Sequence, residues 1–192
     1  MHLQRIRGVT MIIISGTLKG RTIDGFNIEG TRPTMDRVKE SLFGMIQTYI
    51  KDSICLDLFA GSGNLGFEAI SNGSKLCYFN DKNPKCINII NKNIKNFNIS
   101  DNSKVLNLDY HKCLNYLKEQ NIKLDIIFLD PPYKNECLNE IIEFIIKEDL
   151  ISDDGIIVCE VDSNYLKEDF EKLKIIKNRK YGDKFIIIYE KN

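Results

Sequence analysis

The sequence is poor in the residues that several common classes of protein require. Only two histidines, His2 and His111, occur among 192 residues, and the six cysteines form no Cys-x-x-Cys pair. We therefore expect no zinc site built from cysteine and histidine, and we predict no bound metal. Most of the cysteines lie inside apolar runs, which is typical of reduced thiols in the core of a cytoplasmic protein.

The sequence also lacks an excess of charge of one sign and any long apolar run. Lys+Arg 27 against Asp+Glu 27 gives a formal net charge of +0, so no global field attracts the protein to polyanions. Any nucleic-acid surface must therefore be local, and the best candidate is the basic N-terminal stretch that includes Arg21. A solvated and partly frayed tail is the alternative interpretation of this stretch. The run MIIIS is too short to span a membrane, and no signal peptide is recognisable. These features predict a soluble cytoplasmic protein without a membrane partner, and we expect a monomer.

Strand-like and helical patterns alternate after residue 50. We predict strands at 53–58, 75–80, 103–108, 124–129 and 154–161, and helices near 64–72, 83–97, 110–120, 135–148 and 163–170. Two further strand-like runs meet at 181–183 and predict a terminal antiparallel hairpin. The alternation favours an α/β fold with a mostly parallel sheet that is covered by helices on both faces.

The N-terminal fifty residues precede this alternation and form the only separate region that we predict. They begin with a short strand in MIIISG. A helix then follows within TRPTMDRVKESLFGMIQTYI, with Thr34 as its expected N-cap and with apolar residues at helical spacing: Val38, Leu42, Met45, Ile46 and Tyr49. We therefore divide the chain into a small N-terminal extension, residues 1–50, and an α/β domain, residues 51–192.

A glycine-rich loop follows the first strand of this domain, in the stretch from Asp57 to Gly66. Glycines allow the backbone to approach a ligand closely, and the helix that follows offers free N–H groups to an anionic group. The loop is therefore a candidate cofactor site. Its spacing also fits Gly-x-Gly-x-x-Gly, so a nicotinamide oxidoreductase and a glycine turn without a ligand remain alternatives.

Acidic residues stand at the ends of the next two strands. Asp81 follows the second strand, where a ribose diol lies in such folds, and its carboxylate can accept two hydroxyl hydrogen bonds. Asp109 follows the third strand and can accept a hydrogen bond from an adenine amine. Each residue taken singly is also a candidate turn or N-cap residue. Together with Asp57, the two acids favour an adenosine-type ligand.

The fourth strand ends in Asp130-Pro131-Pro132-Tyr133. Successive prolines have no N–H groups and a fixed φ, so they form a rigid exit from the sheet with exposed carbonyls. Asp130 and the Pro131 carbonyl can both accept hydrogen bonds from a single amino group, and Tyr133 offers a flat face for a planar base. A simple turn with a half-buried tyrosine is the alternative interpretation.

These motifs resemble those of the Class I S-adenosylmethionine-dependent methyltransferases that methylate amino groups, whose signature is [D/N/S]PP[Y/F/W]. More closely, the chain resembles the RsmD family, which methylates the exocyclic N2 of a guanine in bacterial small-subunit (16S) rRNA. The resemblance covers nearly the whole chain and is carried by the following motifs: Ile14-Ser15-Gly16, Gly20-Arg21, Thr31-Arg32-Pro33-Thr34, Asp36-Arg37-Val38, Glu40, Leu42-Phe43, Phe59-Ala60-Gly61-Ser62-Gly63, Leu65-Gly66, Glu68-Ala69, Asp130-Pro131-Pro132-Tyr133 and Tyr181-Gly182-Asp183.

The resemblance implies a Class I methyltransferase, Rossmann-like fold with a seven-stranded sheet, and S-adenosylmethionine as the cofactor. It implies that the methionine end of the cofactor is held by the first strand end and its loop: Asp57, Phe59, Ala60, Gly61, Ser62 and Gly63. Asp81 would bind the ribose and Asp109 the adenine, while the N-terminal extension, with Thr34 and Arg37, would cover the cleft.

The same resemblance implies a target base held by Asp130, Pro131, Pro132 and Tyr133. The expected partner is small-subunit rRNA within an assembling 30S particle, with Arg21 and Arg32 as candidate RNA contacts. An adenine-N6 methyltransferase acting on DNA or RNA shares the Asp-Pro-Pro-Tyr chemistry. Because only 73 positions separate Asp57 from Asp130, no target-recognition domain is inserted between them, which favours the RNA enzyme. A non-catalytic RNA chaperone with a vestigial site is a further alternative.

Overall fold

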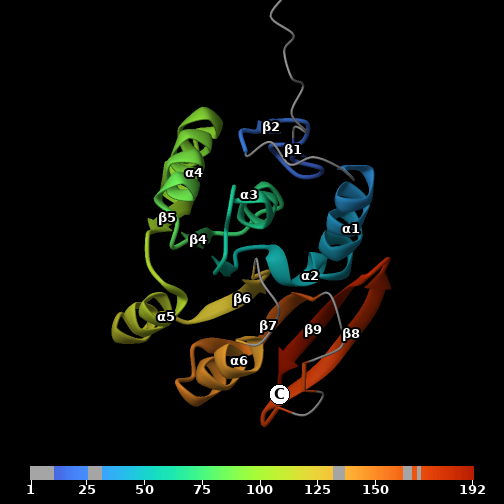
Figure 1. Ribbon diagram of the computed structural model, residues 1–192, viewed down its shortest axis with the longest axis vertical. Helices are drawn as coiled ribbons and strands as arrows, with labels where there is room; N and C mark the ends of the chain where they lie inside the picture. The colour runs from blue at the N-terminus through green and yellow to red at the C-terminus, as the bar shows by residue number, and fades with distance from the viewer. Residues whose placement is uncertain (1–10, 26–31, 132–136, 162–165, 168–169) are drawn as a thin grey trace, which may run out of the picture.

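The computed structural model describes residues 11–25, 32–131, 137–161, 166–167 and 170–192 (Figure 1). Seven strands form the main sheet: β3 (Ile54–Asp57), β4 (Leu76–Asn80), β5 (Ser103–Leu106), β6 (Leu124–Leu129), β7 (Ile151–Val161), β8 (Leu173–Tyr181) and β9 (Lys184–Lys191). The helices are α1 (Arg32–Met45), α2 (Gln47–Ile50), α3 (Asn64–Ser71), α4 (Pro84–Phe97), α5 (Tyr110–Glu119) and α6 (Leu138–Lys147), with a 3-10 turn, η1, at Ser100–Asn102.

The strand order of this sheet is β5-β4-β3-β6-β7-β9-β8. The first five strands in this order are parallel to one another, and β9 runs antiparallel to both β7 and β8. The direction in which successive strands are added reverses between β3 and β6. Ligands of open α/β sheets bind beyond the carboxyl ends of the strands at such a point, so the topology itself indicates where a site lies.

Helices cover both faces of the sheet, as Figure 1 shows. Successive residues of a strand point to opposite faces, so Ile126 and Phe128 of β6 face the core beneath α1, α3 and α4. Ile127 and Leu129 face the other core, beneath α5 and α6. The predicted α/β fold, with a seven-stranded and mostly parallel sheet and a C-terminal antiparallel hairpin, is confirmed. None of the helices in the described part of the chain has the length and apolarity needed to cross a membrane.

The predicted first helix is correct in position but wrong in detail. α1 begins at Arg32, so Thr34 lies inside the helix rather than at its N-cap. The helix ends at Met45, and α2 follows as a separate short helix. The buried stripe is also rotated by about one residue relative to the prediction, because Leu42 and Ile46 are buried as expected while Val38, Met45 and Tyr49 are only partly buried. Lys39, Phe43 and Ile50, which the prediction left out, are buried as well.

The predicted helix at 163–170 is not found at its described residues, Leu166, Lys167 and Phe170. Leu166 and Phe170 are buried, so their spacing of four imitates the apolar stripe of a helix. The backbone groups of Lys167 are bound by side chains instead: its N–H donates to Asn139 Oδ1 at 3.1 Å, and its carbonyl accepts from Tyr189 Oη at 2.8 Å. These tertiary hydrogen bonds replace helical ones at this position.

The N-terminal segment folds onto the outside of α3. Its strands β1 (Met11–Ile12) and β2 (Thr22–Ile23) form a two-stranded antiparallel ladder, which is much shorter than the strand predicted in MIIISG. The ladder stops because the N–H groups of Ile14 and Ser15 donate to the Glu68 carboxylate of α3 at 2.8 to 3.1 Å. The side chains of Ile13 and Ile23 are buried in the same core as α1 and α3.

Candidate functional site

The glycine loop joins the end of β3 to the start of α3. Its last residue, Gly63, is the N-cap of α3 and has a left-handed φ of 86°. Because it is a glycine, it has no side chain with which to cap the helix. Asp57 takes over this function, because its Oδ2 accepts a hydrogen bond from the N–H of Gly66 at 3.0 Å. A Cβ at Gly66 would stand 2.2 Å from Phe79 Cε1, so the glycine lets α3 lie close against β4.

Asp57 is almost completely buried, with 3% of its surface exposed. Burial raises the pKa of its carboxyl group to about 7, which outweighs the opposing effect of the hydrogen bond from Gly66. The nearby carboxylate of Asp81 acts in the same direction as burial and contributes to this raised pKa. An acid held in this state responds strongly to any positive charge brought to the loop.

Asp81 links the second strand end to the same loop. Its Oδ2 accepts from the N–H of Gly61 at 2.9 Å, and its Oδ1 accepts from the N–H of Asn83 at 2.8 Å, just before α4. A Cβ at Gly61 would meet no atom within 4 Å, so the backbone there borders open space. The half-exposed carboxylate of Asp81 therefore lies beside this open stretch of loop.

Asn80 joins three strand ends, and the sequence analysis gave it no role. Its Nδ2 donates to the carbonyls of Leu58 and Leu108, each at 3.1 Å, while its Oδ1 accepts from the N–H of Leu108 at 3.2 Å. The side chain is 1% exposed, so these bonds lie within the protein. Asn80 therefore fixes the loops after β3 and β5 against the end of β4.

Asp109 is the N-cap of α5, because its Oδ1 accepts from the N–H of His111 at 3.0 Å. The alternative that the sequence left open for this residue, a helix cap, is thus present. The residue is half-exposed and lies at the same edge of the sheet as Asp81. Phe59, from the glycine loop, packs near it, with its ring centroid 5.9 Å from that of Tyr110.

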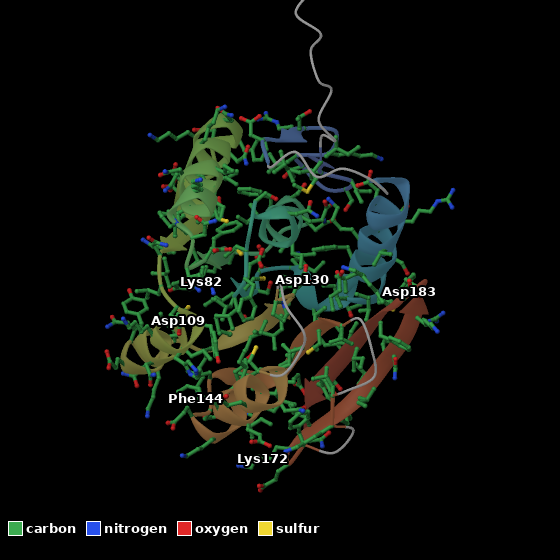
Figure 2. All side chains as sticks on the ribbon, in the orientation of Figure 1. Lys82, Asp109, Asp130, Phe144, Lys172 and Asp183 are labelled. Carbon is green, nitrogen blue, oxygen red and sulfur yellow. The ribbon has the colours of Figure 1, made fainter. Side chains whose placement is uncertain are left out.

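Asp130 and Pro131 leave β6 directly beside the glycine loop. Asp57 of β3 pairs in register with Phe128 of β6, and the N–H of Leu58 donates to the Phe128 carbonyl at 3.3 Å. Asp130 is exposed and Pro131 half-buried. In Figure 2, Asp130 lies at the centre of the view, with Lys82 near the start of α4 to one side and Asp183 at the hairpin turn to the other. The predicted base-binding residues Pro132 and Tyr133 lie outside the described residues.

The other residues that were predicted for the site do not all lie at the carboxyl edge of the sheet. Ser62 is buried, and its Oγ is 3.8 Å from Met11 Sδ of the N-terminal segment. Arg37 is exposed on α1, and the side chains of Arg32 and Thr34 are not described. Arg21 lies at the far end of α4, where its Nη1 donates to the Asn96 carbonyl at 3.2 Å, so the structure does not bring it to the strand ends.

A buried ion pair connects α1 to α3, and sequence reasoning missed it. Lys39 Nζ is 3.0 Å from Glu68 Oε2, and the two side chains are 4% and 1% exposed. Lys39 Nζ also donates to Asn64 Oδ1, in the first turn of α3, and to the Ile12 carbonyl, both at 2.7 Å. The pair thus joins α1, β1 and the helix that follows the glycine loop. One acid in the otherwise apolar stretch LGFEAI was the available signal in the sequence.

The strand order, the glycine loop and the acids at the strand ends are those of a Class I S-adenosylmethionine-dependent methyltransferase. A solved structure described as "Putative methyltransferase yhhF from Escherichia coli" has the same fold, with a TM-score of 0.83 at 27% identity, covering 96% of this chain and 99% of that one. Within the described residues, no group of three or more metal-ligating side chains is present.

The chain belongs to the RsmD family of methyltransferases, whose family model, described as Conserved hypothetical protein 95, matches residues 11–190. "Putative rRNA methyltransferase YlbH" of Bacillus subtilis is 37% identical over 182 residues, which is 94% of this chain and 99% of the relative. "Ribosomal RNA small subunit methyltransferase D" of Haemophilus influenzae is 36% identical over 155 residues, 79% of each chain. Membership of this family leaves the nicotinamide oxidoreductase without support.

Proposed function

We propose that this protein transfers a methyl group from S-adenosylmethionine to the exocyclic N2 of a guanine in small-subunit rRNA. One observation carries the proposal. The strand that leads into the glycine loop, β3, is hydrogen-bonded to the strand that ends in Asp130-Pro131, β6. A methyl donor over the loop and an amino group at Asp130 would therefore be neighbours, as a direct transfer requires. The names of the relatives support rRNA as the substrate.

The loop fits the proposed cofactor. Gly61 borders open space, where a bound molecule can approach the backbone, and Asp81 is half-exposed beside it. In this proposal Asp57 and residues 59–63 hold the methionine end, Asp81 accepts hydrogen bonds from the ribose hydroxyls, and Asp109 receives the adenine amine. When bound, S-adenosylmethionine supplies an electrophilic methyl group on a positively charged sulfur. In this proposal residues 1–50 cover the bound cofactor, and Thr34 and Arg37 of α1 belong to this covering region.

A guanine N2 amine is a weak nucleophile because its lone pair is delocalised into the ring. Asp130 and the Pro131 carbonyl would each accept one of its two N–H groups, which turns the nitrogen lone pair toward the methyl group. The Asp130 carboxylate stabilises the positive charge that develops on the nitrogen and receives its proton. The base itself would stack on Tyr133, next to Pro132.

We further propose that the protein acts as a monomer on an assembling 30S particle. The formal net charge of +0 supports a ribonucleoprotein substrate, because contacts to ribosomal proteins add affinity that bulk electrostatics do not supply. Protein-free rRNA that is methylated as efficiently as particles at moderate salt would contradict this part of the proposal.

The decisive experiment incubates the protein with S-adenosylmethionine and unmethylated small-subunit particles and identifies the methylated nucleoside by mass spectrometry. We expect N2-methylguanosine. The variant Asp130→Ala should lower turnover by about a thousandfold while its affinity for S-adenosylhomocysteine stays unchanged. Asp125→Ala, at the opposite end of the same strand, is the matched control and should keep its turnover.

Each other outcome of this experiment has a defined meaning. N6-methyladenosine would keep the fold and the chemistry but replace guanine by adenine. Loss of both turnover and cofactor affinity in Asp130→Ala would make Asp130 a structural residue. Cofactor binding without methylation of any particle or RNA would favour a non-catalytic RNA-binding protein.

A further inference from the structure

The outward face of α4 carries only lysine and asparagine after its first residue. Its exposed residues beyond Pro84 follow one another at helical spacing: Lys85, Asn88, Asn91, Lys92, Lys95 and Asn96. No aspartate or glutamate occurs in the sequence from Lys82 to Ser100. The face therefore presents positive charges and amide groups, and the helix contributes no carboxylate to it.

The first of these charges, Lys85, does not serve the stability of the helix, whereas Lys95 lies in the last turn, where a positive charge is favourable. Lys85 lies in the first turn of α4, at the positive end of the helix dipole, and this turn contains no acidic residue. The N-cap is Asn83, whose side chain accepts from the N–H of Lys85 at 3.0 Å. A lysine at this position is electrostatically unfavourable for the helix, which indicates that its charge has another use.

The composition of the chain does not explain the α4 face either. Helix α6, in the same lysine-rich and asparagine-rich chain, carries Glu140 and Glu143 on its exposed side together with Lys147. There Glu143 forms an ion pair with Lys167. The two helices differ in the sign of their exposed charge, although both cover the same sheet.

The N-terminal segment adds Arg21 to this face. The buried amide of Asn93 holds the backbone of Asp24, accepting from its N–H at 2.9 Å and donating to its carbonyl at 2.8 Å. Arg21 lies over the Phe97 ring, with its guanidinium carbon 6.0 Å from the centroid, and the β1–β2 segment runs beside α4 in Figure 1. Asp24 pairs with Lys92 at 2.8 Å, both side chains remaining well exposed.

We infer that this face, formed by Lys82, Lys85, Lys92, Lys95 and Arg21, binds the sugar-phosphate backbone of the substrate RNA outside the methylated nucleotide. The inference rests on the proposed function, which makes RNA the substrate. α4 begins at the strand-end edge next to Asp81 and extends for 14 residues, or about 21 Å, away from it. An RNA strand that leaves the site along the helix would meet several of these charges in turn.

The chemistry of the face specifies phosphates and sugars rather than bases. Phosphate oxygens accept hydrogen bonds from lysine and arginine, and asparagine amides bind both phosphates and ribose 2′-hydroxyls. The exposed α4 residues include no aromatic side chain on which a base could stack. Contacts of this kind add affinity without reading sequence, so base selection stays with the Asp130 end of the sheet.

The test compares two triple variants in which the same number of lysines is removed. The first is Lys85→Gln, Lys92→Gln and Lys95→Gln on α4. The second, a matched control on other elements of the fold, is Lys51→Gln, Lys147→Gln and Lys172→Gln, all of which are exposed. We would measure KM for unmethylated small-subunit particles, KM for S-adenosylmethionine, kcat, and direct binding of protein-free small-subunit rRNA over a range of salt concentrations.

We expect the α4 variant to raise KM for the particles and Kd for the RNA by about tenfold, and to reduce the slope of log Kd against log salt by about 2. Its kcat and its KM for S-adenosylmethionine should not change, and its melting temperature should equal that of the control. Lys→Arg at the same three positions should restore RNA affinity, because the charge is kept.

An α4 variant whose Kd and salt slope match those of the control would overturn the inference. Failure of the proposed function looks different: the wild-type protein would then methylate neither particles nor RNA. The binding measurement would still compare the two variants in that case, because it does not depend on turnover.

Discussion

The two ends of strand β6 both carry an aspartate at or near them, and the two residues do different things. At the amino end, Asp125 accepts from the N–H of Ile54 at 2.7 Å and from Ser152 Oγ at 2.6 Å, so it ties β6 to the strands on either side. At the carboxyl end, Asp130 is exposed beside the glycine loop. The same contrast holds for the sheet as a whole.

The amino edge contains a polar groove of about 280 Å³ that is lined in part by acids: Asp52, Asp125, Asp153 and Asp154. At the carboxyl edge, Asp57, Asp81 and Asp109 accept hydrogen bonds from N–H groups of the glycine loop or of helix starts. Acids alone therefore do not distinguish a binding edge from its opposite. The difference is that the acids at the carboxyl edge hold the glycine loop and the helix starts in place. Asp125 instead holds neighbouring strands together.

The strongest way to test this contrast is to remove Asn80. Asn80→Ala removes the hydrogen-bond partner of the Leu108 N–H, the Leu108 carbonyl and the buried Leu58 carbonyl. We expect the free energy of unfolding to fall by about 3 kcal/mol. Because the cofactor loop loses its anchor, affinity for S-adenosylhomocysteine should fall by about tenfold. Urea unfolding and calorimetric titration would measure both; an unchanged affinity would mean that the loop is positioned without Asn80.

A smaller effect is expected at the amino edge. Asp125→Ala removes two hydrogen bonds and should lower the free energy of unfolding by about 1.5 kcal/mol. Affinity for S-adenosylhomocysteine and turnover should stay at wild-type values, since Asp125 accepts these hydrogen bonds from Ile54 and Ser152, away from the glycine loop. A loss of cofactor affinity comparable to that of Asn80→Ala would remove the distinction between the two edges.

A third test concerns pH and the buried carboxyl group of Asp57. Its pKa of about 7 in the folded protein lies above the ordinary value of 3.8, so the folded state binds this proton more tightly than the unfolded chain. Its contribution to the free energy of unfolding is therefore complete below about pH 4 and is lost as the pH rises toward about 7.

Asp57→Asn should abolish this part of the pH dependence. We would measure the free energy of unfolding of the wild-type protein and of the variant, without cofactor, at pH 5 and pH 8. Relative to the variant, the wild-type protein should be less stable at pH 8 than at pH 5. Asp109→Asn, at a half-exposed helix cap, serves as the control. A difference between wild type and Asp57→Asn that is independent of pH would show that Asp57 titrates near its ordinary value.

The strands and the cofactor loop could be predicted because their signals are local. Runs of β-branched and apolar residues lead to Asp57, Asp81, Asp109 and Asp130. Asp57 is the last residue of β3, and the other three acids follow β4, β5 and β6, as expected. The terminal hairpin was equally readable from its Gly182 turn. Patterns of this kind depend on the period of a strand and on turn chemistry, which a single sequence contains.

What could not be predicted depends on contacts between distant residues. Lys39 and Glu68 are charged and would ordinarily be placed at the surface, and only their pairing across 29 positions makes their burial possible. Asn80 looks like part of a turn until its three partners are known. The absence of a helix at Lys167 likewise comes from Asn139 and Tyr189, which bind its backbone from other elements.

The Lys39–Glu68 pair has a consequence for how the chain can be divided. Residues 1–50 contribute the cation, and the α/β domain contributes the anion. Cutting the chain near residue 50 would leave Glu68 in the core with neither its counter-charge nor the N–H groups of Ile14 and Ser15, at a cost of several kcal/mol. We therefore expect an α/β domain excised without residues 1–50 to be less stable than the whole chain, because its buried Glu68 would have lost these partners.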